Sequence, residues 1–334
     1  MDNIRIAVIG GGYWGRKVIR EVRGVSRSAD AVKLHAIVDN SPTMLGQCRE
    51  EFGTNQDYRV DYNELLDDPE LTAVHICTPN PTHYEVASRF LKHGKNVMVE
   101  KPLTLKSGEA YELVRLARDN GAVLCVGHIH RFNNGVRELK RVLDSRVLGD
   151  PFYIRLRWTG LLPPQVQRDV ITDLAPHPFD ISNYLTGKWP VRIACRARGY
   201  RTPANEEVAF ITSEYDDGLT SHVEVSWLDQ EKHRDVAIVA SQGTAFLDCS
   251  DQHIEIVWPD RTEKIAVTPS NTIGTEVLHF IDCIINREDT RFANQSDGLL
   301  GARVVRTLEA AKESLVQDRT VDVDVPVLEE ILAR

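Results

Sequence analysis

Asp173 and His177 are the residues of this sequence best suited to take a proton from a hydroxyl group. They stand at positions i and i+4, which places both on one face of a helix, and Asp180 continues that face at i+7. A carboxylate one turn from a histidine orients the imidazole and makes it more basic, as a general base near neutral pH requires. The alternative is an aspartate N-cap beside an ordinary polar histidine. Pro178 complicates the pattern, because a proline beyond the first turn removes a backbone hydrogen bond and favours a helix that starts after Asp173.

A second charged stretch, Glu100-Lys101-Pro102, follows the apolar run Val97–Val99 directly. In an open α/β sheet, ligands bind in the crevice outside the carboxyl ends of the strands. Glu100 and Lys101 are therefore expected to face a ligand. The alternative is a solvated strand end, since charged residues are common at exposed ends.

A glycine-rich turn lies near the start of the chain. The strand-like run Ile4–Ile9 leads into Gly10-Gly-Gly-Tyr-Trp-Gly15, and a helical pattern follows to about Arg23. This is G-x-G-x-x-G between a strand and a helix. Gly10 permits the tight turn, Gly12 lets the backbone approach a pyrophosphate, and Gly15 lets helix and strand pack closely. The arrangement predicts a dinucleotide site.

The next strand, Val32–Val38, ends in Asp39, which bears on the choice of dinucleotide. An acid at this position accepts hydrogen bonds from the ribose hydroxyls of NAD and repels the 2′-phosphate of NADP. No arginine stands in Asn40–Pro42 to bind that phosphate. The sequence therefore favours NAD, although an aspartate after a strand is also an ordinary helix N-cap.

Strands and helices continue to alternate to about Gly127, which predicts right-handed βαβ units and a parallel sheet in a first domain, residues 1–127. Ala73–Cys77 is expected to be a buried strand. Its exit loop, with Thr78, Asn80 and His83, is expected to border the same crevice as the glycine turn. The alternative is that the prolines of this loop and Thr82 only start the next helix.

Period-two alternation without intervening helices marks a second domain, residues 128–334. Its strands predict a large, mostly antiparallel sheet and hence an α+β domain. Two long helices, Thr275–Asn286 and Ser296–Gln317, a short strand and the tail Leu328–Ala333 close the chain. The six expected strands are Phe152–Trp158, Val191–Arg198, Val208–Tyr215, Leu219–Trp227, Asp235–Ala240 and Thr244–Asp248.

Composition limits the possible partners of the chain. A net charge of −9 argues against a nucleic-acid or anionic-membrane surface, and no apolar run approaches the roughly 20 residues that span a bilayer. No signal-like segment precedes the first strand, so a cytoplasmic protein is expected. The six cysteines are expected to be buried reduced thiols. His128 and His130 lack a third ligand at useful spacing, so no metal is expected there, and both are expected to line the junction of the two domains.

Taken together, the glycine turn, Glu100-Lys101-Pro102 and Asp173-x-x-x-His177 resemble the Gfo/Idh/MocA oxidoreductase family over essentially the whole chain. The resemblance implies an α/β Rossmann domain followed by an α+β domain with a large, mostly antiparallel open sheet. It also implies that Lys101 hydrogen-bonds the substrate oxygen, that His177 takes its proton, and that Asp173 orients His177. Hydride then passes to NAD, and Glu100 faces the ribose or nicotinamide.

Further stretches look like the branch of that family that oxidises carbon 3 of UDP-N-acetylglucosamine. They include Tyr13-Trp14 inside the glycine turn, which we count with the cofactor residues, and Glu276-x-x-His279, whose histidine we count with the substrate residues. The sequence departs from that branch at Pro178 and at Asn271–Gly274. The other stretches are Arg168–Val170 and Ser226–Leu228 with Lys232 and Arg234. A nucleotide-sugar diphosphate needs cationic donors, for which Arg131, Arg157 and Arg168 are candidates, although a single arginine is more often a surface residue.

The leading interpretation is an NAD-dependent dehydrogenase of a UDP-activated N-acetylhexosamine. The nearest alternative acts on a free polyol or sugar such as inositol. A regulator that binds NAD without catalysis has no need of Lys101, Asp173 and His177 in register. A homodimer or homotetramer is expected, with the open sheet covered by another subunit.

Overall fold

The computed structural model describes residues 4–28, 32–165, 168–201, 205–289, 291–326 and 328–333. The chain forms two compact units, each with its own sheet. Unit 1 comprises Met1–Ile129, Asn271–Ala302 and Val327–Arg334, and unit 2 comprises His130–Ser270 and Arg303–Pro326.

Unit 1 contains a six-stranded parallel sheet in the order β3-β2-β1-β4-β5-β6. The order turns back at β1 and β4, the switch point where doubly wound folds bind ligands. The central strands are buried on both faces, which explains why their sequences are mostly apolar and show no period-two alternation. The strands are β1 (Ile4–Ile9), β2 (Val32–Val38), β3 (Tyr58–Arg59), β4 (Ala73–Ile76), β5 (Asn96–Glu100) and β6 (Leu124–Gly127).

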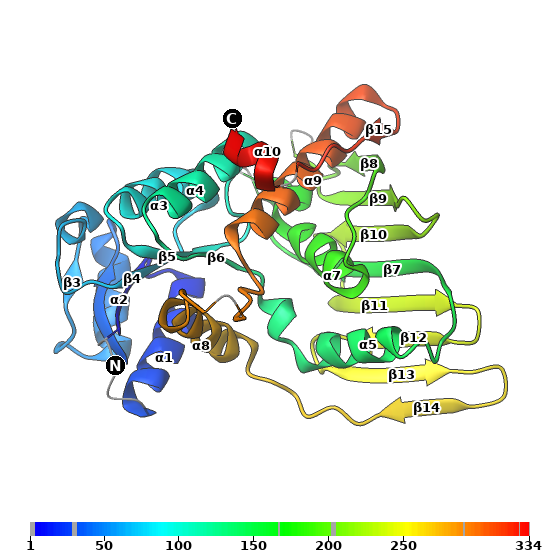
Figure 1. Cartoon of the computed structure of the whole chain (residues 1–334), viewed down its shortest axis with the longest axis horizontal. Helices are drawn as coiled ribbons and strands as arrows, with labels where there is room; N and C mark the ends of the chain where they lie inside the picture. Colours follow the sequence, from blue (N-terminus) through cyan, green and yellow to red (C-terminus); the bar gives the residue numbers. More distant parts are fainter. Residues whose placement is uncertain are drawn as a thin grey trace. The chain divides into compact units, whose positions relative to one another are not determined.

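Helices cover both faces of this sheet. Helices α1 and α8 lie together on one face and α3 and α4 lie on the other (Figure 1). Apolar side chains of α1 and α8 share one buried cluster with β1 and β2. The helices of this unit are α1 (Tyr13–Ser28), α2 (Pro42–Phe52), α3 (His83–Lys92), α4 (Ser107–Asp119), α8 (Thr272–Ile285) and α10 (Leu328–Ala333), with 3₁₀ turns η1 (Tyr62–Leu65), η2 (Asn80–Thr82) and η3 (Ile129–Phe132), the last crossing into unit 2.

Unit 2 contains a nine-stranded sheet in the order β14-β13-β12-β11-β7-β10-β9-β8-β15. Every pair is antiparallel except β7 with β10. This confirms the predicted fold class. The strands are β7 (Pro151–Thr159), β8 (Arg192–Arg198), β9 (Val208–Glu214), β10 (Thr220–Ser226), β11 (His233–Ala240), β12 (Thr244–Asp248), β13 (His253–Val257), β14 (Thr262–Ile265) and β15 (Val321–Asp322).

Two of these strands, β13 and β14, were not expected from the sequence. β13 alternates as a half-buried strand should, but only Ile254 and Ile256 provide its apolar face. β14 is a four-residue edge strand with no buried residue. Such a strand is stabilised by pairing with its neighbour and has little apolar periodicity of its own.

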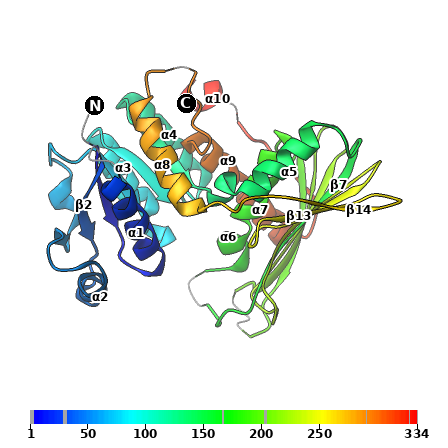
Figure 2. The same cartoon turned by 90° about the horizontal axis from the view of Figure 1, so that it is seen from below.

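All helices of unit 2 lie on one face of its sheet (Figure 2). Among the residues described for this unit, no element lies across the other face. Aromatic side chains there are partly in water: Tyr153, Phe210 and Phe246 are 41%, 45% and 39% exposed. The helices are α5 (Asn134–Asp144), α6 (Val170–Leu174), α7 (Pro176–Thr186) and the C-terminal part of α9 (Gly298–Gln317).

The two units do not match the expected domains, which met between residues 127 and 128. The segment Asn271–Ala302 belongs with unit 1, although it follows the strands of unit 2 in sequence. The reason is that Val277, Phe280 and Ile281 of α8 pack in the same apolar cluster as α1. Among the helices described, none is both long and apolar enough to cross a membrane.

Candidate active site

The glycine turn of unit 1 leaves no space for side chains at two of its three key positions. Gly10 has a φ of +103°, and a Cβ added there would lie 2.6 Å from the carbonyl oxygen of Cys77. A Cβ on Gly15 would come within 1.8 Å of the carbonyl oxygen of Gly10. A Cβ on Gly12 would meet nothing within 4 Å, so the backbone there is open to an incoming group. This pattern fits the three glycine roles of a dinucleotide turn.

Asp39 fastens this turn to the start of α2. Its Oδ2 accepts a hydrogen bond from the backbone N–H of Gly11 at 2.7 Å, and its Oδ1 accepts one from Ser41 at 2.8 Å. Ser41, not Asp39, is the N-cap of α2, since its side chain accepts from the backbone N–H of Met44. A carboxylate has about four acceptor sites, so Asp39 can still accept from ribose hydroxyls.

Tyr13 and Trp14 begin α1 beside a lysine. The Nζ of Lys17 lies 4.5 Å from the centre of the Tyr13 ring and 5.2 Å from that of Trp14. Tyr13 is 73% exposed. Lys17 adds positive charge one turn into the helix whose N-terminus would hold the pyrophosphate.

His83 connects the exit loop of β4 with the end of the Glu100-Lys101-Pro102 stretch. Its Nε2 lies 2.9 Å from the carbonyl oxygen of Thr78, and its Nδ1 lies 2.9 Å from that of Pro102. Burial lowers the pKa of His83. The two contacts with carbonyl oxygens oppose this effect, because they favour the charged ring. His83 and Thr78 therefore hold the backbone next to Lys101. Asn80 begins the 3₁₀ turn between them, and the Lys101–Pro102 peptide bond is cis.

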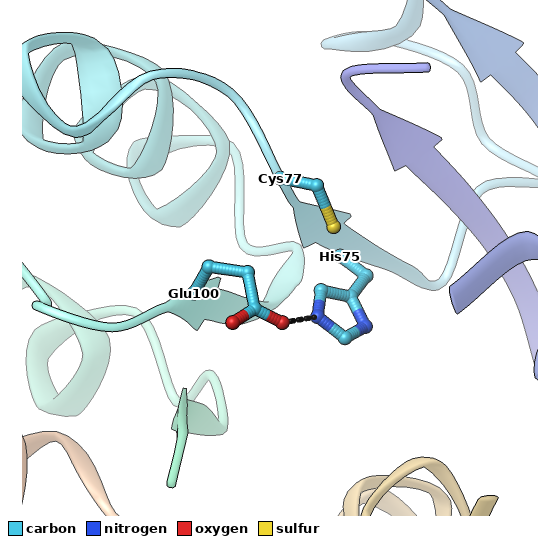
Figure 3. Close-up of side chains that lie close together, drawn as sticks. All are labelled: His75, Cys77 and Glu100. Carbon is cyan, nitrogen blue, oxygen red and sulfur yellow. Dashed lines mark hydrogen bonds and ion pairs between the residues drawn. The ribbon is translucent and has the colours of Figure 1, made fainter. Parts of the chain in front are cut away.

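Glu100 lies in a buried polar group that the sequence did not lead us to expect. Figure 3 shows His75 and Cys77 at the end of β4 and Glu100 on the neighbouring β5. The Nε2 of His75 lies 3.1 Å from Oε1 of Glu100. A ring nitrogen of His75, the sulfur of Cys77 and a carboxylate oxygen of Glu100 all lie within 4.8 Å of one another. Burial and the nearby carboxylates of Glu100 and Glu276 raise the pKa of Cys77 well above its usual value. Two polar residues at i and i+2 in an apolar strand were the available signal for this group.

His177 lies in unit 2, where the predicted continuous helix is in fact two. Helix α6 ends at Leu174 and α7 begins at Pro176, so Asp173 and His177 belong to different helices. The His177 ring stands edge-on to that of His130, with centroids 5.0 Å apart. Trp158 of β7 lies beside both rings, at 5.1 Å from His130 and 6.2 Å from His177. Two imidazoles and an indole thus lie together on the helix-covered face of the sheet.

Asp173 is buried and contacts groups outside its own helix. Its Oδ2 accepts from the indole Nε1 of Trp227 at 3.2 Å, and its Oδ1 accepts from Arg168 at 3.2 Å. The N-cap of α6 is Asp169, so capping is not the role of Asp173. The guanidinium of Arg168 also lies 5.9 Å from the Trp227 ring centre. Arg168 therefore lies beside the expected catalytic carboxylate.

Arg234, which lies outside the expected substrate residues, is close to the same group. Its guanidinium lies 5.9 Å from the Trp158 ring centre and donates to the carbonyl oxygen of Thr159 at 2.7 Å. Burial lowers the pKa of Arg234, and Asp173 opposes that effect. A Cβ added to Gly160 would lie 3.6 Å from the Cα of Lys232, so the two backbone segments run close together. Arg234 thus places a cation at the end of β7 and the start of β11.

The other three expected substrate residues are engaged in contacts of their own within the protein. Arg131 is buried, with its Nε 2.5 Å from Asp180 and its Nη2 2.7 Å from Asn183. Arg157 follows Leu156 and precedes Trp158 on β7, so it points to the opposite face of the sheet, where its Nε lies 2.9 Å from Asp235. His279 is buried in unit 1. None of these placements supports a substrate contact.

Comparison with known proteins agrees with this arrangement. Residues 4–128 match a family model described as an oxidoreductase family with an NAD-binding Rossmann fold, and residues 136–246 match the GFO/IDH/MocA C-terminal domain. The chain belongs to the Gfo/Idh/MocA oxidoreductase family. It is an oxidoreductase, and its first unit contains the family's NAD-binding Rossmann fold.

Individual relatives differ in substrate. The chain is 26% identical to the UDP-N-acetylglucosamine 3-dehydrogenase of Acidithiobacillus ferrooxidans, over 91% of this chain and 95% of that protein. It is also 26% identical to the scyllo-inositol 2-dehydrogenase (NAD(+)) of Bacillus subtilis, over 85% of this chain and 86% of that one. A solved structure of the former enzyme matches with a TM-score of 0.83 at 24% identity, over 94% of this chain and 98% of that chain. Identity alone therefore does not choose between a nucleotide sugar and a free polyol.

Proposed function

We propose that this protein is an NAD-dependent dehydrogenase that oxidises a ring hydroxyl, at carbon 3, of a UDP-activated N-acetylhexosamine. The observation that supports it most is the placement of cations beside the expected catalytic residues. Arg168 donates a hydrogen bond to Asp173, and Arg234 lies over the Trp158 ring beside His177. A free polyol has no charge for such groups to bind, whereas arginine donors suit a diphosphate.

The residues of unit 1 fit NAD. The open backbone at Gly12, the N-terminus of α1 and Lys17 would bind the pyrophosphate, and Asp39 would bind the ribose. Tyr13, Trp14, Thr78, Asn80, His83 and Glu100 would line or support that site. NAD supplies the hydride acceptor when bound.

The proton chemistry belongs to the chain itself. His177 takes the proton from the substrate hydroxyl while Lys101 hydrogen-bonds the same oxygen and stabilises the negative charge that develops on it. Asp173 positions the base, and Trp227 and Arg168 hold Asp173. Asp173 is buried, so little water competes for its hydrogen bonds.

Ligand binding tests the proposal without turnover. Uridine diphosphate at millimolar concentration, added with NAD, should raise the melting temperature of the protein, because a ligand that binds only the folded state stabilises it. Inositol at the same concentration should give a smaller shift. A shift with inositol and none with uridine diphosphate would favour the free-polyol dehydrogenase.

We also propose that a second copy of the chain covers the open face of the nine-stranded sheet. Exposed Tyr153, Phe210 and Phe246 make that face apolar enough to associate. Light scattering should give the mass of a dimer or tetramer. A monomeric mass at micromolar concentration would contradict this part of the proposal.

A further inference from the structure

His75, Cys77 and Glu100 form a cluster of metal-ligating side chains in unit 1 that the proposed reaction does not require. Ile76 of β4 pairs with Val99 of β5 in the parallel sheet, so the next residue of each strand comes side by side. Those residues are Cys77 and Glu100. His75 lies on the same face as Cys77, because residues two apart in a strand point the same way. Figure 3 shows the three side chains gathered at the ends of the two strands.

A glycine on the third strand leaves room for the carboxylate of this cluster. Gly127 of β6 is the pairing partner of Glu100 on β5. A Cβ added to Gly127 would lie 2.7 Å from Oε2 of Glu100, so any side chain there would displace the carboxylate. Glu100 can therefore fold back over the sheet, where it reaches His75. Three neighbouring strands, β4, β5 and β6, thus build the cluster together.

The distances within the cluster suit a single small cation. Zinc binds nitrogen and oxygen ligands at about 2.0–2.2 Å in a tetrahedron, so two such atoms on one ion lie roughly 3.3 Å apart. The Nε2 of His75 and Oε1 of Glu100 are 3.1 Å apart. The sulfur of Cys77 lies within 4.8 Å of both ligand groups. Since a zinc–sulfur bond is about 2.3 Å long, small side-chain rotations would bring all three atoms to one ion.

Burial and charge also fit a divalent cation. His75 and Glu100 are 1% and 8% exposed, and buried charges need partners of opposite sign. A thiolate and a carboxylate together carry two negative charges, which one divalent ion neutralises. Cys77 is partly exposed, whereas the other five cysteines are buried, so an ion can enter at Cys77. The alternative is a hydrogen-bonded pair of His75 and Glu100 beside an ordinary thiol, which would bind no ion.

We propose that His75, Cys77 and Glu100 bind a divalent transition-metal ion, for which zinc fits the mixed nitrogen, sulfur and oxygen ligands best. On binding, the Cys77 thiol releases its proton to solvent and the thiolate bonds the ion. Three protein ligands leave a fourth position for water. In the described part of the chain, no other three His, Cys, Asp or Glu side chains bring their ligand atoms so close together. The site does not depend on which sugar the enzyme oxidises.

Titration of the reduced, chelator-treated, full-length protein with cobalt(II) tests this site, because cobalt takes zinc positions and absorbs light. One equivalent should bind and give a thiolate-to-cobalt charge-transfer band in the near ultraviolet. Zinc should then displace the cobalt and remove the band. Cys77→Ser should bind cobalt without that band, whereas Cys249→Ser should behave as wild type, since Cys249 is a buried thiol of unit 2.

Calorimetric titration with zinc extends the test to the histidine. His75→Ala should weaken zinc binding by about tenfold or more, since even residues that only support a ligand contribute that much. His93→Ala, which removes an exposed histidine at the end of α3, should not change it. Wild-type protein that gives no charge-transfer band with one equivalent of cobalt would overturn the proposal, even if a variant failed to fold. A band that persists in Cys77→Ser, or zinc affinity unchanged in His75→Ala, would also overturn it.

Discussion

The indole Nε1 of Trp227 donates a hydrogen bond to Oδ2 of Asp173 across 3.2 Å. Trp227 follows β10 directly and Asp173 lies in α6, so a strand end fixes a carboxylate on a separate short helix. Both side chains are buried. The orientation of Asp173 is therefore set by tertiary contacts with the sheet as well as by its own helix.

Replacing Trp227 by phenylalanine removes this hydrogen bond and keeps an aromatic ring in place. A hydrogen bond to a charged group contributes about 1.5–3 kcal/mol, so kcat/KM should fall about tenfold or more. Trp258→Phe is the matched control, since the indole nitrogen of that partly buried tryptophan has no hydrogen-bond partner among the described residues. Equal kinetics for both variants would show that Trp227 does not position Asp173.

Removing either proton-handling residue should abolish most of the turnover. His177→Ala and Lys101→Ala should each lower kcat by roughly 10²–10⁴-fold, the range for a positioned proton-transfer group. Affinity for NAD, measured by fluorescence titration, should stay nearly unchanged for His177→Ala, because the expected NAD residues are all in unit 1. His93→Ala, at the end of α3, serves as control. Wild-type turnover in His177→Ala would exclude it as the base.

Asp39 should decide the preference for NAD over NADP. Its carboxylate repels a 2′-phosphate, so Asp39→Asn should lower the ratio of kcat/KM for NAD to that for NADP by about tenfold. The amide still offers one acceptor oxygen for the Gly11 N–H, which limits damage to the glycine turn. Asp61→Asn, at an exposed 3₁₀ turn, should leave the ratio alone. An unchanged ratio in Asp39→Asn would refute this assignment.

Arg168 and Arg157 provide a matched pair for the diphosphate. Arg168→Met should raise KM for a UDP-sugar by about tenfold or more, since a charge-assisted hydrogen bond is lost. Arg157→Met should change KM less than twofold, because that side chain lies on the opposite face of the sheet beside Asp235. Steady-state kinetics compares them. A larger effect from Arg157 would place the diphosphate elsewhere.

The sequence predicted the fold classes well because both rest on periodicity. Unbroken apolar runs such as Val97–Val99 mark buried parallel strands, and alternation in β7 marks a sheet with one covered face. The same alternation separates Arg157 from Trp158. Because neighbouring residues of a strand point to opposite faces, Trp158 reaches His177 and Arg157 does not. Choosing arginines only by their nearness in sequence overlooks this alternation.

Contacts between segments that are distant in the chain could not be predicted from the sequence. His75, Cys77 and Glu100 meet because β4 and β5 pair in a particular register, and Val277 and Phe280 join the first core because α8 packs against α1. The break between α6 and α7 was foreseeable in part, from the prolines on either side of His177. The role of Trp227 had no local signal, since an indole beside a carboxylate depends on tertiary packing.

The production of NADH from a panel of substrates tests the central claim most directly. With purified protein and NAD, a UDP-N-acetylhexosamine should give a kcat/KM at least about 100-fold above those of myo-inositol and scyllo-inositol, because the inositols lack the diphosphate to which the arginines would donate charge-assisted hydrogen bonds. Reduction of the product with borodeuteride should place deuterium at carbon 3. Faster NADH formation with an inositol than with any UDP-sugar would contradict the account.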